Sequence, residues 1–465
     1  MTLHRSAEER ARAGRAARKR LSRSSHGAWI PSADRPDPVS VLRRQDSGRI
    51  PELLPLRYAR MAASPAAFLR GAPAVTAADL AAVPHSGLVV QLCGDAHLLN
   101  FGLYASPERP RVFDIGDLDE TLPGPFEWDV KRLAASVAVT ALDNGHDGRA
   151  ARRSVLASVL AYRRTVRRLA GLGELAAWYE RVDTRGMPPP VPHGRGAGTG
   201  RTAPPDTELP PPGRLTEVVA GRRRFVPHPP LLEPAGDTDR SVLLKVFADH
   251  RSTLGGERRR LLDRFHAVGV ARTATGVAGV GIRGFVVLLE GRDVDDVLFL
   301  RFTEARASVL EAHLGPGPHP HAGRRVVAGR RLLQAEEDLF AGWVTGPLGR
   351  HFSWHRLRDV RGPAEVPAMA PGPLRRYAAL CGATLGRGHA RSGDRIALAA
   401  YLGGGDVFDR AVCDFAMRYA DRASADHAAL LAALAAGTPT AAADPGGPGP
   451  AESEASPRIR TDGIP

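Results

Sequence analysis

The chain has 465 residues, of which 43% are hydrophobic, 64 are Lys or Arg and 50 are Asp or Glu. This apolar share excludes a wholly disordered chain, and no apolar run reaches the roughly 18 residues that a membrane span needs. The N-terminus lacks the apolar segment of a secretory signal, and three widely spaced cysteines predict neither a disulfide framework nor a zinc site. We expect a cytoplasmic protein.

The net charge of +14 is partly concentrated at the N-terminus, where residues 1–25 carry eight basic and two acidic side chains. Residues 1–45 show no apolar period, so we predict a disordered basic arm. Such an arm is usually a solvated tail. Binding of nucleic acid through the arm and the many arginines is therefore kept as an alternative function rather than the first one.

From about residue 50 the apolar pattern predicts both strands and helices. In chain order we expect strands at 88–92 and 111–113, helices at 127–142 and 152–170, helices within 241–266, a strand at 270–275, a hairpin of strands 284–290 and 297–302, and helices at 304–313, 324–340 and 374–389. This order predicts an α+β protein. Residues 185–214 are rich in Pro and Gly and predict a linker or insertion, and residues 436–465 predict a disordered tail.

The strongest chemical signal is an acidic constellation within QLCGDAHLLNFGLY and RVFDIGDLDETLPGPFEWDVKRLAAS. Asp95 and Asn100 follow the first strand, and Asp114 ends the second. A carboxylate beside an amide suits Mg²⁺, and another carboxylate can accept a hydroxyl proton, which together are the minimal set for phosphoryl transfer. Asp117 and Asp119 are either further ligands or solvated loop acids. A polar turn that bonds only its own backbone is the alternative for the whole motif.

These strings resemble the catalytic core of the aminoglycoside phosphotransferase and protein-kinase-like enzymes, in which H-G-D-x-x-x-x-N precedes a hydrophobic-Asp pair and a Gly-Pro turn with D-L-A. The resemblance implies that Asp95 is the catalytic base, that Asn100 and Asp114 hold Mg²⁺, and that Asp129 braces the catalytic loop. His97 either braces the loop or meets substrate. Cys93 stands where that superfamily usually has histidine.

A second resemblance covers about residues 50–430, on strings such as LRYARMAASPAAFLRGA, GDAHLLNFG, FVVLLEGRDVDDVLFL and GHARSGD. These are similar to the bacterial domain of unknown function 2252 family. The segment with the expected catalytic loop and Mg²⁺ site (46–184) precedes the predicted small-lobe hairpin and C-terminal helices (215–435). A two-lobed kinase-like fold would therefore be circularly permuted.

Glycines 276, 279 and 281 precede the predicted hairpin and resemble the nucleotide cover of a kinase small lobe, although a plain hairpin turn explains them equally well. The lysine that kinases place on their third strand is replaced by Thr303, with Arg301 on the same strand face. We expect Arg301 and the three glycines to contact phosphate. If Thr303 abolishes turnover, the alternative is a nucleotide-binding pseudokinase.

GHARSGD places His389 and Arg391 at the end of a predicted helix, either as a helix stop or facing the site. The expected function is thus an ATP- and Mg²⁺-dependent phosphotransferase acting on a hydroxyl of a small molecule or protein.

Overall fold

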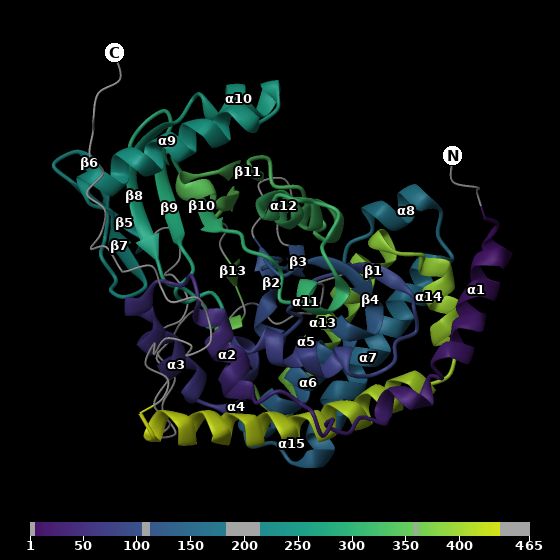
Figure 1. Ribbon diagram of the computed structural model, residues 1–465. Coiled ribbons are helices and arrows are strands. Elements are labelled where there is room, and N and C mark those ends of the chain that lie inside the picture. The colour runs from purple at the N-terminus through teal and green to yellow at the C-terminus, as the bar shows by residue number, and fades with distance from the viewer. Residues whose placement is uncertain (1–4, 105–111, 183–213, 358–359, 362, 438–465) are drawn as a thin grey trace.

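The computed structural model describes residues 5–104, 112–182, 214–357, 360–361 and 363–437, and it contains both helices and strands, as the predicted α+β class requires (Figure 1). The predicted linker at 185–214 lies outside the described residues except for Arg214, and so does the predicted tail except for residues 436 and 437. Within the described part of the chain, no helix is long and apolar enough to cross a membrane.

A six-stranded antiparallel sheet forms one part of the molecule (Figure 1). Its order is β11 (Gly342–Thr345), β12 (His351–Arg356), β10 (Val297–Glu304), β9 (Gly284–Glu290), β8 (His266–Thr273) and β7 (Leu232–Pro234). On one face Leu300, Phe302 and Trp354 pack under helix α9 (Asp237–Thr253). Phe299 lies in the core of the opposite face, with Phe225 from the small hairpin of β5 (Thr216–Val219) and β6 (Arg222–Phe225). Alternation along β10 places Arg301 on the Phe299 side.

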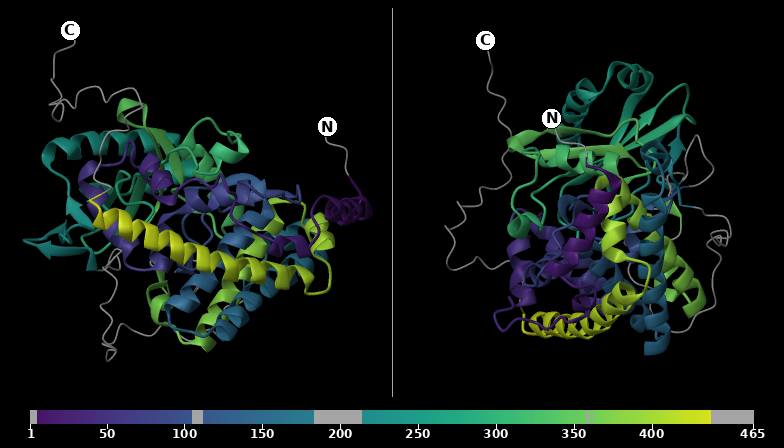
Figure 2. Two further views of the ribbon diagram at one scale, coloured as in Figure 1. Left: turned by 60° about the horizontal axis from the view of Figure 1, so that its bottom comes forward. Right: turned by 90° about the vertical axis from the view of Figure 1, so that its right-hand side faces the viewer.

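The second part is a helical body built on α6 (Phe126–Asp143), α7 (Gly148–Ala170), α13 (Pro371–Ser392) and α15 (Val407–Ala435). Helices α7 and α13 approach closely because glycines line their contact. A Cβ atom at Gly382 would lie 2.0 Å from the Ser158 carbonyl oxygen, and one at Gly386 would lie 2.9 Å from that of Tyr162. Helix α15 runs along the bottom of the molecule in Figure 1 and crosses its front in the left view of Figure 2.

Between the sheet and the body lies the acidic segment, built on β1 (Val89–Leu92), β2 (Phe101–Tyr104), β3 (Val112–Ile115) and β4 (Leu122–Pro125). Strand β1 pairs with β4, and β2 pairs with β3. The remaining elements are α2 (Pro38–Asp46), α3 (Leu54–Ala62), α4 (Pro65–Gly71), α5 (Pro73–Ala81), α8 (Glu174–Tyr179), α10 (Gly256–Leu262), α11 (Glu311–Leu314), α12 (Ala322–Leu333), α14 (Arg395–Leu402) and β13 (Val360–Arg361).

The prediction of a disordered arm over 1–45 is wrong for its described residues, because Ala7–Arg20 form helix α1 and Pro38–Asp46 form α2. Helix α1 begins with a capping box between Ser6 and Glu9. It packs on α14 through small residues, since a Cβ at Gly14 would lie 2.0 Å from the Ala397 carbonyl oxygen. A helix contact made of Gly and Ala lacks large apolar residues at helical spacing. The sequence pattern therefore did not predict helix α1.

Three other predicted boundaries shift. The helix expected at 304–313 is mostly absent because β10 extends to Glu304 against β12, and only α11 follows. The helix expected at 324–340 ends at Leu333 in α12. The helical stretch at 241–266 divides into α9 and α10 around Gly255, and His266 already belongs to β8. In contrast, the hairpin of β9 and β10 and the helices α6, α7 and α13 lie where they were predicted.

Candidate functional site

A buried carboxylate holds the loop that follows β1. Asp129, at the start of α6, accepts hydrogen bonds from the backbone N–H groups of Cys93 at 2.6 Å and Gly94 at 3.0 Å. Its Oδ2 also lies 3.1 Å from Nε2 of His389, and the other His389 nitrogen lies 2.9 Å from the Tyr162 hydroxyl. Gly94 has φ +88°, a conformation that favours glycine. These contacts fix the direction in which the next residue, Asp95, points.

Asp95 is paired with a buried arginine that the sequence analysis did not single out. Arg132 donates from Nε at 2.7 Å and from Nη2 at 2.5 Å, both to Oδ1 of Asp95. The other carboxylate oxygen, Oδ2, lies 3.8 Å from Nε2 of His97. Burial lowers the pKa of His97 to about 4, so this imidazole is neutral at pH 7. Asp95 itself is 16% exposed. One of its oxygens is thus held by Arg132, and the other faces His97.

The side-chain amide of Asn100 forms hydrogen bonds with nearby backbone groups. Its Nδ2 donates to the carbonyl oxygens of Asp95 at 3.1 Å and Asp117 at 2.9 Å, and its Oδ1 accepts from the Asp117 N–H at 2.6 Å. It therefore ties two acidic turns together. This role differs from the predicted role of Mg²⁺ ligand.

Asp114 is likewise engaged by other groups. Its Oδ1 accepts from Nη2 of Arg387 at 2.6 Å and from the Ile115 N–H at 3.0 Å, and its Oδ2 accepts from the Ala335 N–H at 2.5 Å. The Asp114 and Arg387 side chains are 5% and 1% exposed. A carboxylate with this many donors in a buried pocket is a structural ion pair, so Asp114 does not fit the predicted role of metal ligand.

Asp117 and Asp119 follow Asp114 on the turn after β3. The Asp117 side chain is 65% exposed, and its Oδ1 lies 4.0 Å from Nη2 of Arg330 on α12. Burial, followed by the charge of Asp117, raises the pKa of Asp119 to about 7, while Arg330 and Arg301 act in the opposite direction. Across the described ranges, no three His, Cys, Asp or Glu side chains are grouped to hold a metal ion. The acidic turn thus carries one exposed carboxylate, Asp117, and one half-buried carboxylate, Asp119, and the guanidinium groups of Arg330 and Arg301 lie near them.

The glycine turn that precedes β9 is fastened to the N-terminal part of the chain. Nη1 of Arg60 donates to the carbonyl oxygens of Ala274 and Gly276, and Nη1 of Arg49 donates to those of Ala278 and Val280. Burial lowers the pKa of Arg49 to about 9. The turn is therefore pinned through its carbonyl oxygens.

The three glycines of the turn differ in their surroundings. Gly276 (φ +73°) and Gly281 (φ +85°) need glycine's conformational freedom, whereas Gly279 does not. A Cβ at Gly276 would lie 3.9 Å from Nη2 of Arg70, whose charge also influences His97. A Cβ at Gly281 would meet the Arg49 side chain at 3.1 Å. The Gly276 end of the turn therefore lies near Arg70, and the Gly281 end lies against Arg49.

Strand β10 brings Arg301 toward the acidic turn and keeps Thr303 buried. Nη2 of Arg301 donates to Oγ1 of Thr275 at 2.9 Å, and its charge is close enough to act on Asp119. Thr303 is 8% exposed and pairs with Gly284 on one side and Ser353 on the other. The described part of the strand thus offers a guanidinium rather than an ammonium group to this site.

The two residues predicted from GHARSGD take separate places on α13. His389 is fully buried against Asp129 and belongs to the support of the loop. Arg391 donates to the Gln334 carbonyl oxygen at 2.6 Å, and its guanidinium carbon lies 4.0 Å from the centre of the Trp178 ring. Burial and then Arg387 lower the pKa of Arg391 to about 10. No contact between Arg391 and the exposed acids is seen in the described residues.

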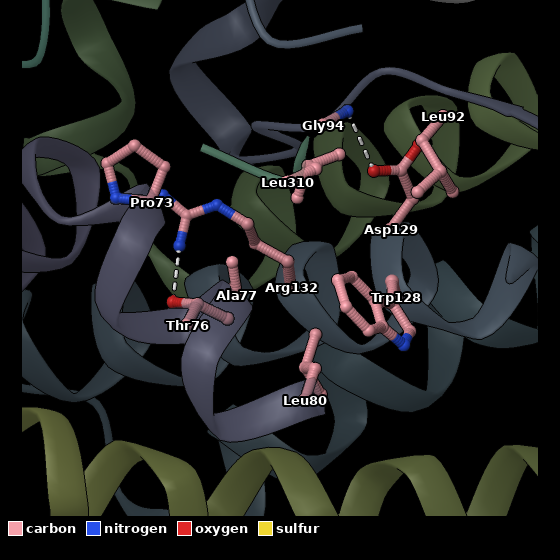
Figure 3. A pocket seen from close by; sticks show the side chains of 10 residues that line it. All are labelled: Pro73, Thr76, Ala77, Leu80, Leu92, Gly94, Trp128, Asp129, Arg132 and Leu310. Atoms are coloured by element: carbon pink, nitrogen blue, oxygen red, sulfur yellow. Dashed lines mark hydrogen bonds between the residues drawn. The ribbon is translucent and has the colours of Figure 1, made fainter. Parts of the chain in front are cut away.

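A small cavity lies beside the loop that follows β1, with Leu92 and Gly94 in its lining (Figure 3). Its lining includes Thr76 and Leu80 of α5 and Trp128 and Arg132 of α6, and the figure shows Arg132 extending between these helices to Thr76. Most of the residues that line the cavity are apolar. The sequence held a signal for Arg132 that was not used, since it lies three residues after Asp129 on the same helix face.

The model of the family described as "Uncharacterized protein conserved in bacteria (DUF2252)" matches residues 49–433. The chain therefore belongs to this family, as the resemblance of its motifs predicted. A search of curated proteins and a search of solved structures each returned no match.

Proposed function

We propose that this protein binds a nucleoside triphosphate with Mg²⁺ between the sheet and the helical body and transfers a phosphoryl group to a hydroxyl. One observation carries the proposal: Asn100 joins the turn of Asp95 to the turn of Asp117 and Asp119, and the guanidinium groups of Arg301 on β10 and Arg330 on α12 lie near the second turn. Phosphoryl transfer requires a proton acceptor, cation ligands and positive groups for the phosphates, and this segment offers all three.

Asp95 would be the proton acceptor. As the hydroxyl oxygen attacks the terminal phosphorus, its proton passes to Oδ2 of Asp95, the bond from the terminal phosphorus to its bridging oxygen breaks, and the nucleoside diphosphate leaves. Oδ1 remains bonded to Arg132 throughout. The neutral His97 beside Oδ2 adds no positive charge that would oppose proton transfer.

Asp117 and Asp119 fit a divalent cation better than Asn100 and Asp114 do. Asp117 is exposed and Asp119 is half-buried. Burial and then the charge of Asp117 raise the pKa of Asp119, and a cation bound between the two carboxylates would relieve their repulsion. Mg²⁺ needs few protein ligands because water and phosphate oxygens complete its shell. Bound there, it would neutralise the developing charge of the phosphates.

We further propose that the architecture is a circularly permuted kinase-like fold. In support, an antiparallel sheet adjoins a mainly helical body, and the loop carrying Asp95 sits between strands β1 and β2, ahead of the sheet in the chain. The two parts would act as the nucleotide-covering and substrate-binding lobes.

Thermal unfolding with and without ATP and Mg²⁺ tests this function. A ligand at about 100 times its Kd stabilises by roughly 2.7 kcal/mol, so we expect an upward shift of several degrees. Asp117→Asn should lose the Mg²⁺-dependent part of the shift, whereas Asp114→Asn should lower the midpoint of the free protein and keep the shift. Asp95→Asn should keep the shift and abolish turnover. Absence of any shift in the wild-type protein at millimolar ATP would overturn the proposal.

A nucleotide-binding pseudokinase is the second candidate, and the surroundings of β10 favour it. Thr303 stands where kinases have lysine, Arg301 is bonded to Thr275, and the glycine turn is held by two arginines. The discriminating result is binding of ATP without phosphate transfer to itself or to candidate acceptors. In that case Thr303→Lys is the variant to assay for gain of turnover.

The contacts of the N-terminal arm disfavour the third candidate function, nucleic-acid binding through that arm. Arg10 pairs with Asp394, and the guanidinium groups of Arg18 and Arg23 donate to carbonyl oxygens near the end of α14. These arginines are engaged with the body. A steep loss of nucleic-acid affinity with rising salt, absent after deletion of residues 1–25, would nevertheless support this function.

A further inference from the structure

We propose that Arg132 is a positioning residue for Asp95 and that a buried chain of polar contacts anchors it to helix α15 and to Arg35. The proposal rests on the function proposed above, because it assigns to Arg132 and its partners the task of orienting the proton acceptor. The sequence motifs predicted no role for Arg132 or for these partners.

Arg132 is bonded on every side. Its Nε and Nη2 meet Oδ1 of Asp95, its Nη1 donates to Oγ1 of Thr76 at 2.6 Å, and its Nη2 also donates to the Leu69 carbonyl oxygen at 3.0 Å. The Arg132 side chain is 3% exposed. A planar guanidinium fixed at three nitrogens cannot rotate without breaking several bonds, so it determines which Asp95 oxygen faces His97.

The contacts continue beyond Thr76. The Tyr419 hydroxyl lies 3.3 Å from Oγ1 of Thr76 and donates to Oδ2 of Asp79 at 2.8 Å. Tyr419 belongs to α15, whereas Thr76 and Asp79 belong to α5. Both the tyrosine and the two α5 side chains are buried. The orientation of Arg132 is therefore coupled to the packing of α15 on the body.

Arg35 closes the chain of contacts. It forms two forked pairs, with Asp79 at 2.6 and 2.9 Å and with Asp426 of α15 at 3.0 and 2.6 Å. Arg422 also pairs with Asp426. The network thus holds three carboxylates and three guanidinium groups, a balance that buried charges require. Arg35 lies before the family match at residues 49–433, yet it is joined through this network to Asp95.

The experiment compares Arg132→Met, Arg132→Lys and Tyr419→Phe with Tyr401→Phe as the matched control. Tyr401 is also a buried tyrosine of the body, but its hydroxyl bonds to His26 and to the Leu21 carbonyl oxygen. For each protein, the affinity for ATP and Mg²⁺ is measured by calorimetry, and turnover is measured as the rate of ADP release.

We expect Arg132→Met to keep the wild-type Kd and to lose turnover by about 100-fold, the smaller end of what a positioned general base provides. Arg132→Lys should restore part of the lost turnover, because an ammonium group can still donate a hydrogen bond to Asp95, and Tyr419→Phe should lower turnover several-fold at unchanged Kd. Wild-type turnover in Arg132→Met, or equal effects of the two tyrosine variants, would overturn the proposal.

If the wild-type protein neither binds ATP nor releases ADP, the proposed function fails but the pairing remains testable. The pairing of Arg132 with Asp95 is then tested by the unfolding free energies of three proteins: Asp95→Asn, Arg132→Met and the double variant. We expect the double variant to be more stable than Arg132→Met alone, because it removes a carboxylate left without its partner. Strictly additive losses would show that Arg132 does not act through Asp95.

Discussion

The helical body and the six-stranded sheet bury different kinds of side chain. The body encloses buried polar pairs, among them Asp129 with His389 and the ion pair of Asp114 with Arg387. The sheet encloses an aromatic stack, in which the ring centres of Phe302 and Trp354 lie 4.2 Å apart. Hydrogen bonds and ion pairs have preferred directions, so they can orient a loop. Packed aromatic rings fill the core and stabilise it, but they do not fix the direction of a neighbouring loop. The acidic segment accordingly takes its geometry from the body.

The largest expected effect is removal of the carboxylate that supports the loop. Asp129→Ala leaves two backbone N–H groups and His389 without their acceptor in a buried site. We expect unfolding in urea to show a loss of about 4–5 kcal/mol, at the upper end for a broken buried pair. A loss below 1 kcal/mol would mean that the charged support of the body is not what holds the loop.

A similar but smaller loss is expected from the sheet. Phe302 is fully buried between Phe285 and Trp354, with ring centres at 4.9 and 4.2 Å. Phe302→Ala should cost about 3–4 kcal/mol through lost burial and the cavity left behind. Leu339→Ala, at an exposed position, is the control and should change the unfolding free energy little. Equal losses in the two variants would refute the role assigned to the stack.

The sheet should also respond to acid through one buried imidazole. His250 lies parallel to Trp354 with ring centres 4.6 Å apart, and burial lowers its pKa to about 3. Between that value and the ordinary pKa near 6.5, the unfolded chain binds a proton that the folded chain does not, so stability falls as pH falls.

This imidazole should therefore remove about 2 kcal/mol of stability between pH 7 and pH 5. His250→Gln should lessen that loss, and the exposed His266→Gln should not. The measurement is the unfolding free energy at both pH values. An unchanged pH dependence in His250→Gln would exclude His250 as its source.

The smallest effect is expected from a charged pair of the body that is not buried. Arg152 and Asp414 are 2.8 Å apart with side chains 50% and 47% exposed. Arg152→Ala should lower the unfolding free energy by less than about 1 kcal/mol, because water and salt screen exposed pairs. If Arg152→Ala lost as much unfolding free energy as Asp129→Ala, burial would not explain the difference expected between the two pairs.

Much of the local structure was predictable because it depends on neighbours in the sequence. Apolar spacing located α6, α7, α13 and the β9–β10 hairpin. The grouping of Asp95, Asp117 and Asp119 was also visible, since all three follow short strands in one segment. The helix α1 was missed because its packing on α14 relies on Gly14 and on arginines that reach carbonyl oxygens, neither of which has an apolar period.

The sequence by itself therefore determined the fold class, the family and the segment that carries the acids. Only the tertiary structure decided which acids are already occupied. Asp114 is engaged by Arg387, 273 residues away, and Asp95 by Arg132, 37 residues away, whereas Asp117 is left exposed. The reason is physical: the charge state and freedom of a carboxylate depend on the donors that folding brings to it, and those donors come from distant parts of the chain.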